Sequence, residues 1–473
     1  MAAESDAYDV VIIGAGIGGL VCGCYLAKAG MKVLIAEQHF KPGGYCTSFT
    51  RKGFTFDAAA HSFGGYREGG IVKKVVSDLK MENRLHISKN DPSDTIIAPD
   101  CRLSFWSDIH RTVEEFMTAF PEERLNIKSF FEVMGSVGPH LFVKMRRWTF
   151  LDFLERCFRN EKLKAVLAFP LFTNGGLPPS MLSFCSGATI FSEFLMDGGY
   201  YPKGGMQALP DAFAETFKTS GGELRLSCRI KKISLRKGMV TGIITEENEP
   251  IRARYIISNG DARETFFSLV GGRSLGCDFR AKIKTMIPSS SYVAAYLGLN
   301  RTMQSPFVSG TTVGYLPHYD LGKMYRNGHQ GRITNGTGYI MRFSSDANTL
   351  TAIAAAPYKN EAFWKENKKA YGDALVKHID RTTVPGLMQN IEYQESATPL
   401  TFRRYTSNYR GAAYGWASLC SQFADMEMKK PPGIQNLFLT GHWTTQGIGI
   451  TGVVYSGLTT AELVRKIHSR KVA

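Results

Sequence analysis

The feature that most constrains the fold lies within the first forty residues. Residues 10–13 form a short, wholly apolar, β-branched run, as expected of a buried parallel strand. The run leads directly into a GxGxxG turn at residues 14–19, and an apolar helical pattern follows and ends at Gly30. A second strand is predicted over residues 31–36. This order of strand, turn, helix and strand predicts the first unit of a parallel sheet that binds a dinucleotide.

The glycines of this turn have separate physical roles. Gly14 allows the tight turn, Gly16 lets a diphosphate approach the backbone, and Gly19 lets the helix pack closely on the strand. The helix N-terminus, with Ala15 and Gly18 in the same turn, presents free N–H groups and a positive dipole end. We therefore expect the diphosphate of the cofactor at this turn.

An acidic residue closes the second strand. Glu37 follows Gly14 by 23 residues, where a carboxylate can accept hydrogen bonds from both hydroxyls of a ribose. The same negative charge would repel a 2′-phosphate. We therefore expect a dinucleotide other than NADP.

The balance of charge indicates an anionic partner. The chain has 473 residues, enough for two domains, and a net charge of +15. No zinc-finger spacing, helix-turn-helix signal or basic low-complexity tail supports a nucleic-acid partner. An anionic membrane surface therefore fits the charge better, and no nucleic acid is expected.

Residues 141–172 are the most informative part of the region that would contact a membrane. Basic residues border a stripe of apolar side chains at helical spacing. The stripe consists of Phe142, Met145, Trp148, Leu151, Leu154, Cys157 and Phe158. Two interpretations stay open: a core-facing helix with a solvated basic side, or a helix that rests on an anionic membrane surface.

The cysteines and the N-terminus bear on location. The nine cysteines are scattered and odd in number, and no CxxC occurs, so we expect free thiols in a reducing compartment. The residues before the first strand are acidic, which is the wrong sign for a signal peptide, and no stretch is apolar enough to span a bilayer. These features predict a cytoplasmic protein with peripheral membrane association.

Later landmarks return the chain to the first sheet. A turn at residues 202–205 leads into a helix and a strand over residues 223–230, and residues 231–257 alternate as a meander does. A further strand is predicted over residues 291–299 and a helix over residues 359–380. We expect the strands of residues 262–430 to complete a second domain, in which their sheet forms the wall of a pocket.

The last block repeats the glycine pattern in another setting. A strand over residues 437–440 ends at Gly441, and a second GxGxxG at residues 447–452 follows a loop and opens a long helix. A second dinucleotide site is a poor fit, because no strand precedes this turn. We interpret it as a helix N-terminus aimed at the far end of the first cofactor, where its dipole would stabilise negative charge.

These pieces together resemble the FAD-dependent amine-oxidase-type superfamily, in particular its branch of phytoene desaturases, carotenoid isomerases and retinol saturases. The matching blocks are GAGIGGLVCGCYLAKAG, LIAEQ, PGGYCTSF, GFTFD, YPKGGMQALPDAFAE, GGELRL, TPLTFRRYTSNYRGAAYGW and NLFLTGHWTTQGIGITGVVYSG. The resemblance implies an α/β fold: a Rossmann-type, glutathione-reductase-like FAD-binding domain with an inserted mixed α+β substrate domain. The FAD-binding domain would comprise residues 1–70, 200–265 and 431–473, and the substrate domain residues 71–199 and 266–430.

The resemblance also implies positions that contact FAD. The diphosphate turn is matched by the glycines above, and the ribose acid by Glu37 with Gln38 beside it. The remaining positions are Gly43, Gly44, Thr47 and Ser48 beside the diphosphate, Ile230 at the adenine, and Gly441, His442, Ile450, Thr451, Gly452 and Val453 at the flavin. His442 stands where much of the family has an acid, so its contact with the ribityl chain stays open.

No metal-ligand cluster, nucleophile triad or acid–base pair is visible, and hydride exchange with a flavin needs none. The resemblance implies desaturation, saturation or cis–trans isomerisation of an apolar isoprenoid or carotenoid-like polyene. No second nucleotide domain for NAD(P)H is visible in the sequence, so we expect electrons to pass to a quinone or oxygen, or to return to the substrate. We expect Trp443, Thr444 and Thr445 to face the flavin ring, with His61 opposite. For His61, a structural histidine that is hydrogen-bonded is the alternative.

Two other functions stay open. An amine oxidase on the same fold would need an aromatic cage, which Tyr414, Trp416 and Trp443 could supply. A lipid-binding escort protein that has lost its flavin is the third hypothesis, and the intact glycine loop at residues 42–44 argues against it.

Overall fold

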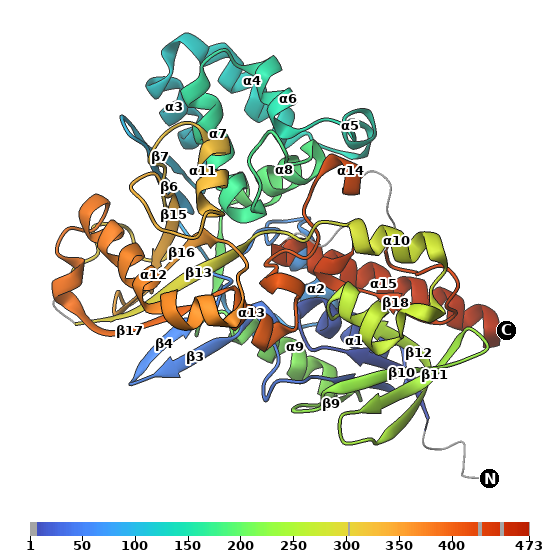
Figure 1. Ribbon diagram of the computed structural model, residues 1–473. Coiled ribbons are helices and arrows are strands. Elements are labelled where there is room, and N and C mark those ends of the chain that lie inside the picture. The colour runs from blue at the N-terminus through green and yellow to red at the C-terminus, as the bar shows by residue number, and fades with distance from the viewer. Residues whose placement is uncertain (1–6, 301–302, 424–427, 445–448, 473) are drawn as a thin grey trace.

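A computed structural model describes residues 7–300, 303–423, 428–444 and 449–472 (Figure 1). Two seven-stranded sheets organise these residues. The first sheet has the order β10-β11-β12-β1-β2-β9, and β18 pairs with β12. Its strands are β1 (Tyr8–Ile13), β2 (Val33–Ala36), β9 (Glu223–Arg225), β10 (Ile230–Arg236), β11 (Met239–Thr245), β12 (Pro250–Ser258) and β18 (Leu437–Leu439).

The central strands of this sheet are parallel. β1 pairs in parallel with β2 and β12, and β2 pairs in parallel with β9. On the edge away from β1, β12 has two partners: its first half pairs antiparallel with β11, and its second half pairs parallel with β18. The carboxyl ends of β1, β2, β12 and β18 therefore meet at one edge, as the apolar runs predict.

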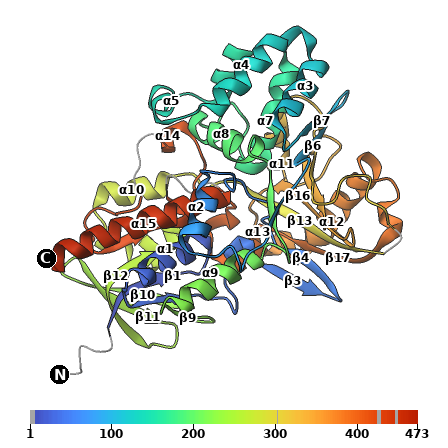
Figure 2. The same ribbon diagram turned by 180° about the vertical axis from the view of Figure 1, so that it is seen from behind.

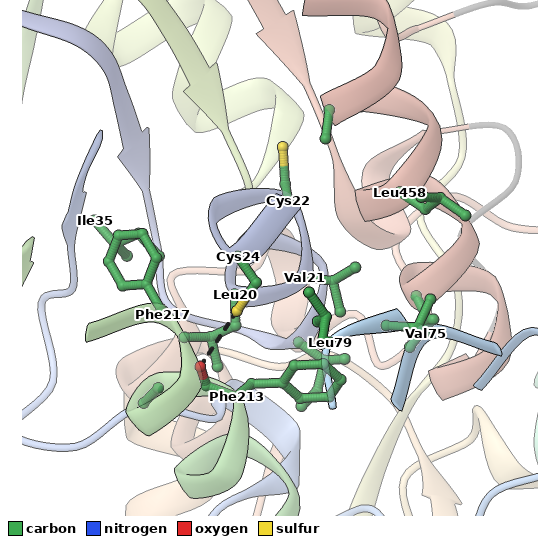
Figure 3. Packing of buried hydrophobic residues seen from close by; sticks show 14 of the residues in the cluster. Leu20, Val21, Cys22, Cys24, Ile35, Val75, Leu79, Phe213, Phe217 and Leu458 are labelled. Atoms are coloured by element: carbon green, nitrogen blue, oxygen red, sulfur yellow. Dashed lines mark hydrogen bonds between the residues drawn. The ribbon is translucent and has the colours of Figure 1, made fainter. Parts of the chain in front are cut away.

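Helices α1 (Ile17–Lys28), α2 (Ile71–Asp78), α9 (Ala208–Thr219) and α15 (Gly449–Val472) pack together beside this sheet (Figure 3). Cys24 of α1 donates its S–H to the carbonyl of Phe213 in α9 at 3.3 Å. α1 and α15 approach so closely that a Cβ on Gly457 would lie 2.6 Å from the carbonyl oxygen of Gly18. The first and last helices therefore form one packed layer.

The second sheet has the order β17-β13-β16-β15-β14-β6-β7. Its strands are β6 (Asp94–Ile97), β7 (Arg102–Phe105), β13 (Ser291–Leu299), β14 (Thr312–Tyr315), β15 (Tyr339–Phe343), β16 (Thr349–Ala356) and β17 (Ile391–Ala397). Its neighbours are antiparallel except for the parallel pair β6 and β14. One face packs on α12 (Glu361–Thr382), and the other packs on the hairpin of residues 48–57 and on Phe402.

A cluster of helices forms the rest of the inserted region, above both sheets in Figure 1. It comprises α3 (Ile109–Ala119), α4 (Arg124–Gly135), α5 (Pro139–Lys144), α6 (Phe150–Cys157), α7 (Glu161–Gly175) and α8 (Phe184–Ile190). The remaining elements are β3 (Ser48–Arg51), β4 (Phe54–Asp57), β5 (Ile87–Lys89), β8 (Tyr200–Pro202), α10 (Cys277–Thr285), α11 (Leu321–Gly328), α13 (Pro399–Thr406) and α14 (Cys420–Phe423). Figure 2 shows the same arrangement from behind.

The interpretation of residues 141–172 as one helix is wrong. Three helices, α5, α6 and α7, cover this stretch. α6 begins with a capping box in which the Thr149 hydroxyl accepts from the N–H of Asp152 and the Asp152 carboxylate accepts from the N–H of Thr149. The side chain of Asn160 caps α7 by accepting from the N–H of Leu163, and Phe158 between α6 and α7 is extended. Each cap starts a new helix and turns the chain.

Other predicted elements are confirmed or adjusted. The strand at residues 291–299 and the helix at residues 359–380 are confirmed as β13 and α12. The strand expected over residues 223–230 is instead two strands, β9 and β10, because the chain turns at Ser227 with a φ of +52°.

The described helices include none that is both long and apolar enough to cross a bilayer. All nine cysteines are free thiols. The predicted domain boundaries stay a prediction.

Candidate active site

A cavity of about 330 Å³ lies between the two sheets, at the carboxyl edge of the first. Segments that are far apart in the sequence line it together, including the turn after β1, the ends of β2 and β12, and the start of α15. The predicted positions in its lining are His61, Gly14, Gly16, Gly18, Glu37, Gln38, Gly43, Gly44, Ile230, Gly441, His442, Ile450, Thr451 and Val453. The position is that expected for a ligand of an open α/β sheet.

Asn259 holds the glycine turn in place. Its side-chain amide donates to the carbonyl of Gly14 at 3.3 Å, and Gly14 has a φ of +96°. A Cβ on Gly16 would lie 2.9 Å from Asn259 Nδ2, and one on Gly18 would lie 2.8 Å from Asn259 Oδ1. Sequence reasoning missed Asn259, although its place just after a β12 strand end at the ligand-binding edge was a usable signal.

The two ends of the chain meet at this turn. A Cβ on Gly18 would lie 2.9 Å from Cα of Gly441, and a Cβ on Gly441 would overlap Oδ1 of Asn259. The first turn of α15 also lines the cavity through Gly449 and Ile450. The N-terminal turn and the C-terminal helix tip therefore enclose one cavity, as the sequence predicts.

Glu37 is buried at the end of β2. Its carboxylate accepts from the N–H of Ala15 at 2.7 Å and from the N–H of His39 at 2.8 Å. Burial raises the pKa of Glu37, and these backbone hydrogen bonds oppose the shift. Each carboxylate oxygen has a second lone pair, so Glu37 fits the ribose of a bound dinucleotide. That role stays a prediction.

The glycine loop at residues 42–44 is tied to the turn after β1. The N–H of Gly43 donates to the carbonyl of Ala15 at 2.9 Å, and Gly43 has a φ of +130°. The loop therefore presents its backbone to the cavity, where no side chain obstructs a diphosphate.

Five predicted contact positions lie just outside the cavity lining. The Ser48 hydroxyl donates to Asp57 at 2.7 Å, and the Thr47 hydroxyl donates to the carbonyl of Gly44 at 3.0 Å. A Cβ on Gly19 would overlap the carbonyl oxygen of Gly14, so Gly19 serves helix–strand packing. Ala15 and Gly452 also lie outside the lining. These residues shape the loops that carry the lining.

Trp443 and Thr444 do not line the cavity, in contrast to the expectation that they face a flavin ring. The indole of Trp443 is fully buried, donates to Oδ1 of Asn408 at 2.8 Å, and packs edge-on against Trp416. The Thr444 hydroxyl donates to the carbonyl of Gly441 at 2.8 Å. The turn at Gly441–Trp443 therefore points the indole into the core. Thr445 lies outside the described residues.

His61 lies in the cavity wall. Its Nε2 is buried and has no hydrogen-bond partner among the described residues. Burial and the nearby charge of Arg342 lower the pKa of His61 to about 4, so the imidazole is neutral at neutral pH. The free nitrogen favours the interpretation of His61 as a cofactor- or substrate-facing residue over that of a fully hydrogen-bonded structural histidine.

His442 also lines the cavity, with its Nε2 3.3 Å from Oδ1 of Asn408. Burial lowers the pKa of His442 to about 4. In the unfolded chain the imidazole of His442 becomes protonated below about pH 6.5, whereas in the folded chain it becomes protonated only below about pH 4. His442 therefore lowers the stability of the folded state as the pH falls from about 6.5 to about 4.

We expect His442→Gln to flatten the loss of thermal stability between about pH 6.5 and pH 4. Thermal unfolding across this pH range measures the effect. The matched control is His140→Gln, at an exposed histidine of α5. Parallel curves for the wild type and His442→Gln would contradict this account.

The part of the cavity away from the glycine turn is largely apolar. Ile340 and Ile353 of the second sheet line it, and Tyr292 and Tyr414 face each other edge-on with ring centroids 6.2 Å apart. Phe194 lines it from the helical cluster. The second sheet is thus one wall of the pocket, as expected. Of the aromatic cage considered from the sequence, only Tyr414 lines the cavity.

The model of the flavin containing amine oxidoreductase family matches residues 17–465 of this chain. The chain belongs to this family. The flavin of this family agrees with the FAD predicted from the sequence. The glycine-lined cradle leaves room for the diphosphate of that cofactor. The chain is therefore a flavin-dependent oxidoreductase.

Relatives with curated functions match over nearly the whole chain. The all-trans-retinol 13,14-reductase of Danio rerio is 23% identical, over 97% of this chain and 86% of the relative. The chloroplastic prolycopene isomerase of Arabidopsis thaliana is 23% identical over 97% and 82%, and the lycopene-forming phytoene desaturase of Pseudescherichia vulneris is 25% identical over 96% and 98%. A solved oxidoreductase from Methanosarcina mazei, 17% identical, shares the fold with a TM-score of 0.68 over 96% of this chain and 99% of its own.

Proposed function

We propose that this flavin-dependent oxidoreductase acts on a long apolar isoprenoid or carotenoid-like polyene. One observation carries the proposal: a single cavity joins the dinucleotide cradle to an apolar wall of Ile340, Ile353 and Phe194. The relatives that act on retinol, prolycopene and phytoene support the same substrate class. Among the described residues, no group of three or more acidic, histidine or cysteine side chains could hold a metal ion.

Bound FAD would supply hydride exchange, which serves desaturation, saturation or isomerisation. The chain's own residues would bind and orient the substrate. The apolar wall would hold the polyene by area alone, while the backbone at Gly14, Gly16 and Gly43 would fix the diphosphate. Tyr292 and Tyr414, whose rings pack on each other, would lie together along one side of the substrate and exclude water. A quinone or oxygen would accept electrons where the reaction releases them.

The experiment is anaerobic incubation of the purified protein, with its flavin oxidised in one sample and chemically reduced in another, with phytoene, prolycopene and all-trans-retinol, each in detergent micelles. We expect one polyene to shift its chromophore; a desaturation would bleach the oxidised flavin, and a saturation would reoxidise the reduced flavin. Turnover of simple amines with release of peroxide, and no change with polyenes, would favour the amine oxidase. A colourless protein that binds polyenes without reaction would favour the escort protein.

We propose α5 as the part of the chain that contacts an anionic membrane surface. No residue of α5 is buried, Val143 is 68% exposed, and Lys144 is exposed beside it. Arg146 and Arg147 follow directly and are also exposed. The apolar side of α7, by contrast, is buried in the core of the helical cluster. Of the basic stretch considered from the sequence, α5 and the two arginines therefore combine exposed apolar surface with positive charge.

Flotation with phosphatidylserine-containing vesicles tests this contact. Replacing Lys144, Arg146 and Arg147 by serine should lower the vesicle-bound fraction about tenfold or more at low salt, since each basic residue near such a surface contributes about 1 kcal/mol. The control replaces Lys232, Arg236 and Arg252, which are exposed on the β10–β12 meander. A wild-type protein that stays wholly in the soluble fraction would contradict the membrane contact.

A further inference from the structure

Polar side chains occupy three neighbouring strands of the second sheet, next to His61 in the cavity wall. Thr312 of β14 pairs with Arg342 of β15 on one side and with Asp94 of β6 on the other. Residues two apart on a strand share a face, so Arg342 points to the same side as Ile340, which lines the cavity. The row from Asp94 to Arg342 therefore continues the cavity-facing side of the sheet.

Arg342 is a buried cation with little compensation. It is 9% exposed, and its guanidinium lies 4.2 Å from the ring centre of Tyr201. Among the described residues it donates one hydrogen bond, to the carbonyl of His61, and no carboxylate lies within 4.0 Å of it. A guanidinium carries five N–H donors in a planar fork, so most of these donors lack a protein acceptor.

Further polar atoms around Arg342 are buried without a partner among the described residues. They are Nε2 of His61, Oγ of Ser62, Nδ2 of Asn90, Oδ2 of Asp94 and Oγ1 of Thr312. We call this set, with Arg342, the Arg342 chamber.

Two glycines show that the members of the chamber lie close together. A Cβ on Gly310 would meet Asn90 Oδ1 at 3.2 Å and the Arg342 guanidinium at 3.4 Å. A Cβ on Gly199 would meet Asn90 Nδ2 at 3.5 Å and Cβ of Ser62 at 3.6 Å. Buried polar atoms are normally hydrogen-bonded, so the oxygens of a ligand or of water complete this group.

We propose that the Arg342 chamber binds the carboxylate end of a polyene acid whose apolar chain lies in the cavity. The proposal rests on the proposed function, and it names the class of substrate. His61 and Ser62 line the cavity and also belong to the chamber, and Arg342 donates to the carbonyl of His61, so the chamber lies directly against the cavity wall.

The balance of donors and acceptors favours a carboxylate over other chain ends. Arg342 and the Asn90 amide nitrogen only donate, and a carboxylate accepts from a guanidinium through two parallel hydrogen bonds. A hydroxyl end would satisfy fewer of these donors, and a hydrocarbon end would satisfy none. A ligand carboxylate would also give Arg342 a directly hydrogen-bonded counter-charge, whereas the carboxylates of Asp57 and Asp94 act on it without such a contact.

Asp94 opposes this ligand when it is ionised. Burial raises the pKa of Asp94 to about 7, against the opposing effect of Arg342. Of the other groups near Arg342, the imidazole of His61 is neutral, and Asp57 accepts from the hydroxyl of Tyr201 at 2.6 Å. The charge of Asp346 acts on Tyr201, where it raises the pKa of the phenol. Protonated Asp94 donates to the ligand and ionised Asp94 repels it, so affinity for the acid falls as pH rises through about 7.

The test titrates the flavin-loaded protein with all-trans-retinoate, all-trans-retinol and β-carotene, one unit below and one unit above pH 7. Below pH 7 we expect retinoate to bind about tenfold or more tighter than retinol. Arg342→Met should remove this preference and leave retinol binding nearly unchanged, while Asp94→Asn should remove the pH dependence. Arg332→Met, at an exposed arginine, is the matched control.

Retained flavin absorbance shows that each variant is folded, and Arg342→Lys, which keeps the charge without the planar fork, should recover only part of the preference. Equal binding of retinoate and retinol, or an unchanged preference in Arg342→Met, would overturn the subsite and leave the proposed function standing. Failure of all three polyenes to bind would overturn both.

Discussion

Replacing Gly16 by valine should yield a folded protein that purifies without its flavin. A Cβ at this position already lies 2.9 Å from Asn259 Nδ2, and the two methyl groups beyond it would occupy the space that the diphosphate needs. We expect a loss of about 3 kcal/mol or more of binding free energy, which is roughly a hundredfold in affinity. The ratio of flavin absorbance to protein absorbance after purification measures it.

Gly276→Ala is the control for this variant. Gly276 precedes α10, and a Cβ there would meet no atom within 4 Å. This control should retain full flavin content. A Gly16→Val protein with as much flavin as the wild type would show that the cofactor does not approach this turn.

Replacing Gly64 by alanine should destabilise the protein more than other single-methyl additions around the cavity. A Cβ at Gly64 would overlap the carbonyl oxygen of Glu193 and lie 2.8 Å from Cα of Phe194. Both obstacles are backbone atoms of the π-helical turn Phe191–Leu195, which cannot move as a flexible side chain does. We expect a cost of about 3 kcal/mol, at the upper end of the range for overpacking.

Thermal unfolding, followed by the release of flavin fluorescence, measures this cost. Gly260→Ala is the control, because Gly260 also lines the cavity but a Cβ there would have its nearest neighbour at 3.6 Å. Equal unfolding temperatures for the two variants would contradict the close backbone contact at Gly64.

Short patterns of neighbouring residues predicted strands of both sheets correctly. The β-branched run before Gly14 became β1, and the apolar run at residues 291–299 became β13 with the expected boundaries. The break between α5 and α6 was also readable, since Thr149 and Asp152 have the spacing of a capping box. The apolar stripe within residues 141–172 favoured one continuous helix and so concealed this capping signal.

The remaining site residues were not predictable, because strand register brings them together. Asn259 reaches the glycine turn only since β12 pairs beside β1, and Arg342 lies near His61 only through the order of the second sheet. The same limit explains Trp443: a tight turn at Gly441 sets the direction of its indole, and no periodicity in the sequence reports that direction. Motif spacing places a residue near a site, whereas packing decides which way it points.

The contact between Gly18 and Gly441 has a consequence for how a cell makes this enzyme. The two glycines are 423 positions apart, so a ribosome has to synthesise nearly the whole chain before the second one exists. Until then one side of the cradle is missing, and β12 lacks its partner β18. The complete flavin cradle can therefore form only after the segment with β18 and Gly441 has been synthesised and has paired with the N-terminal sheet.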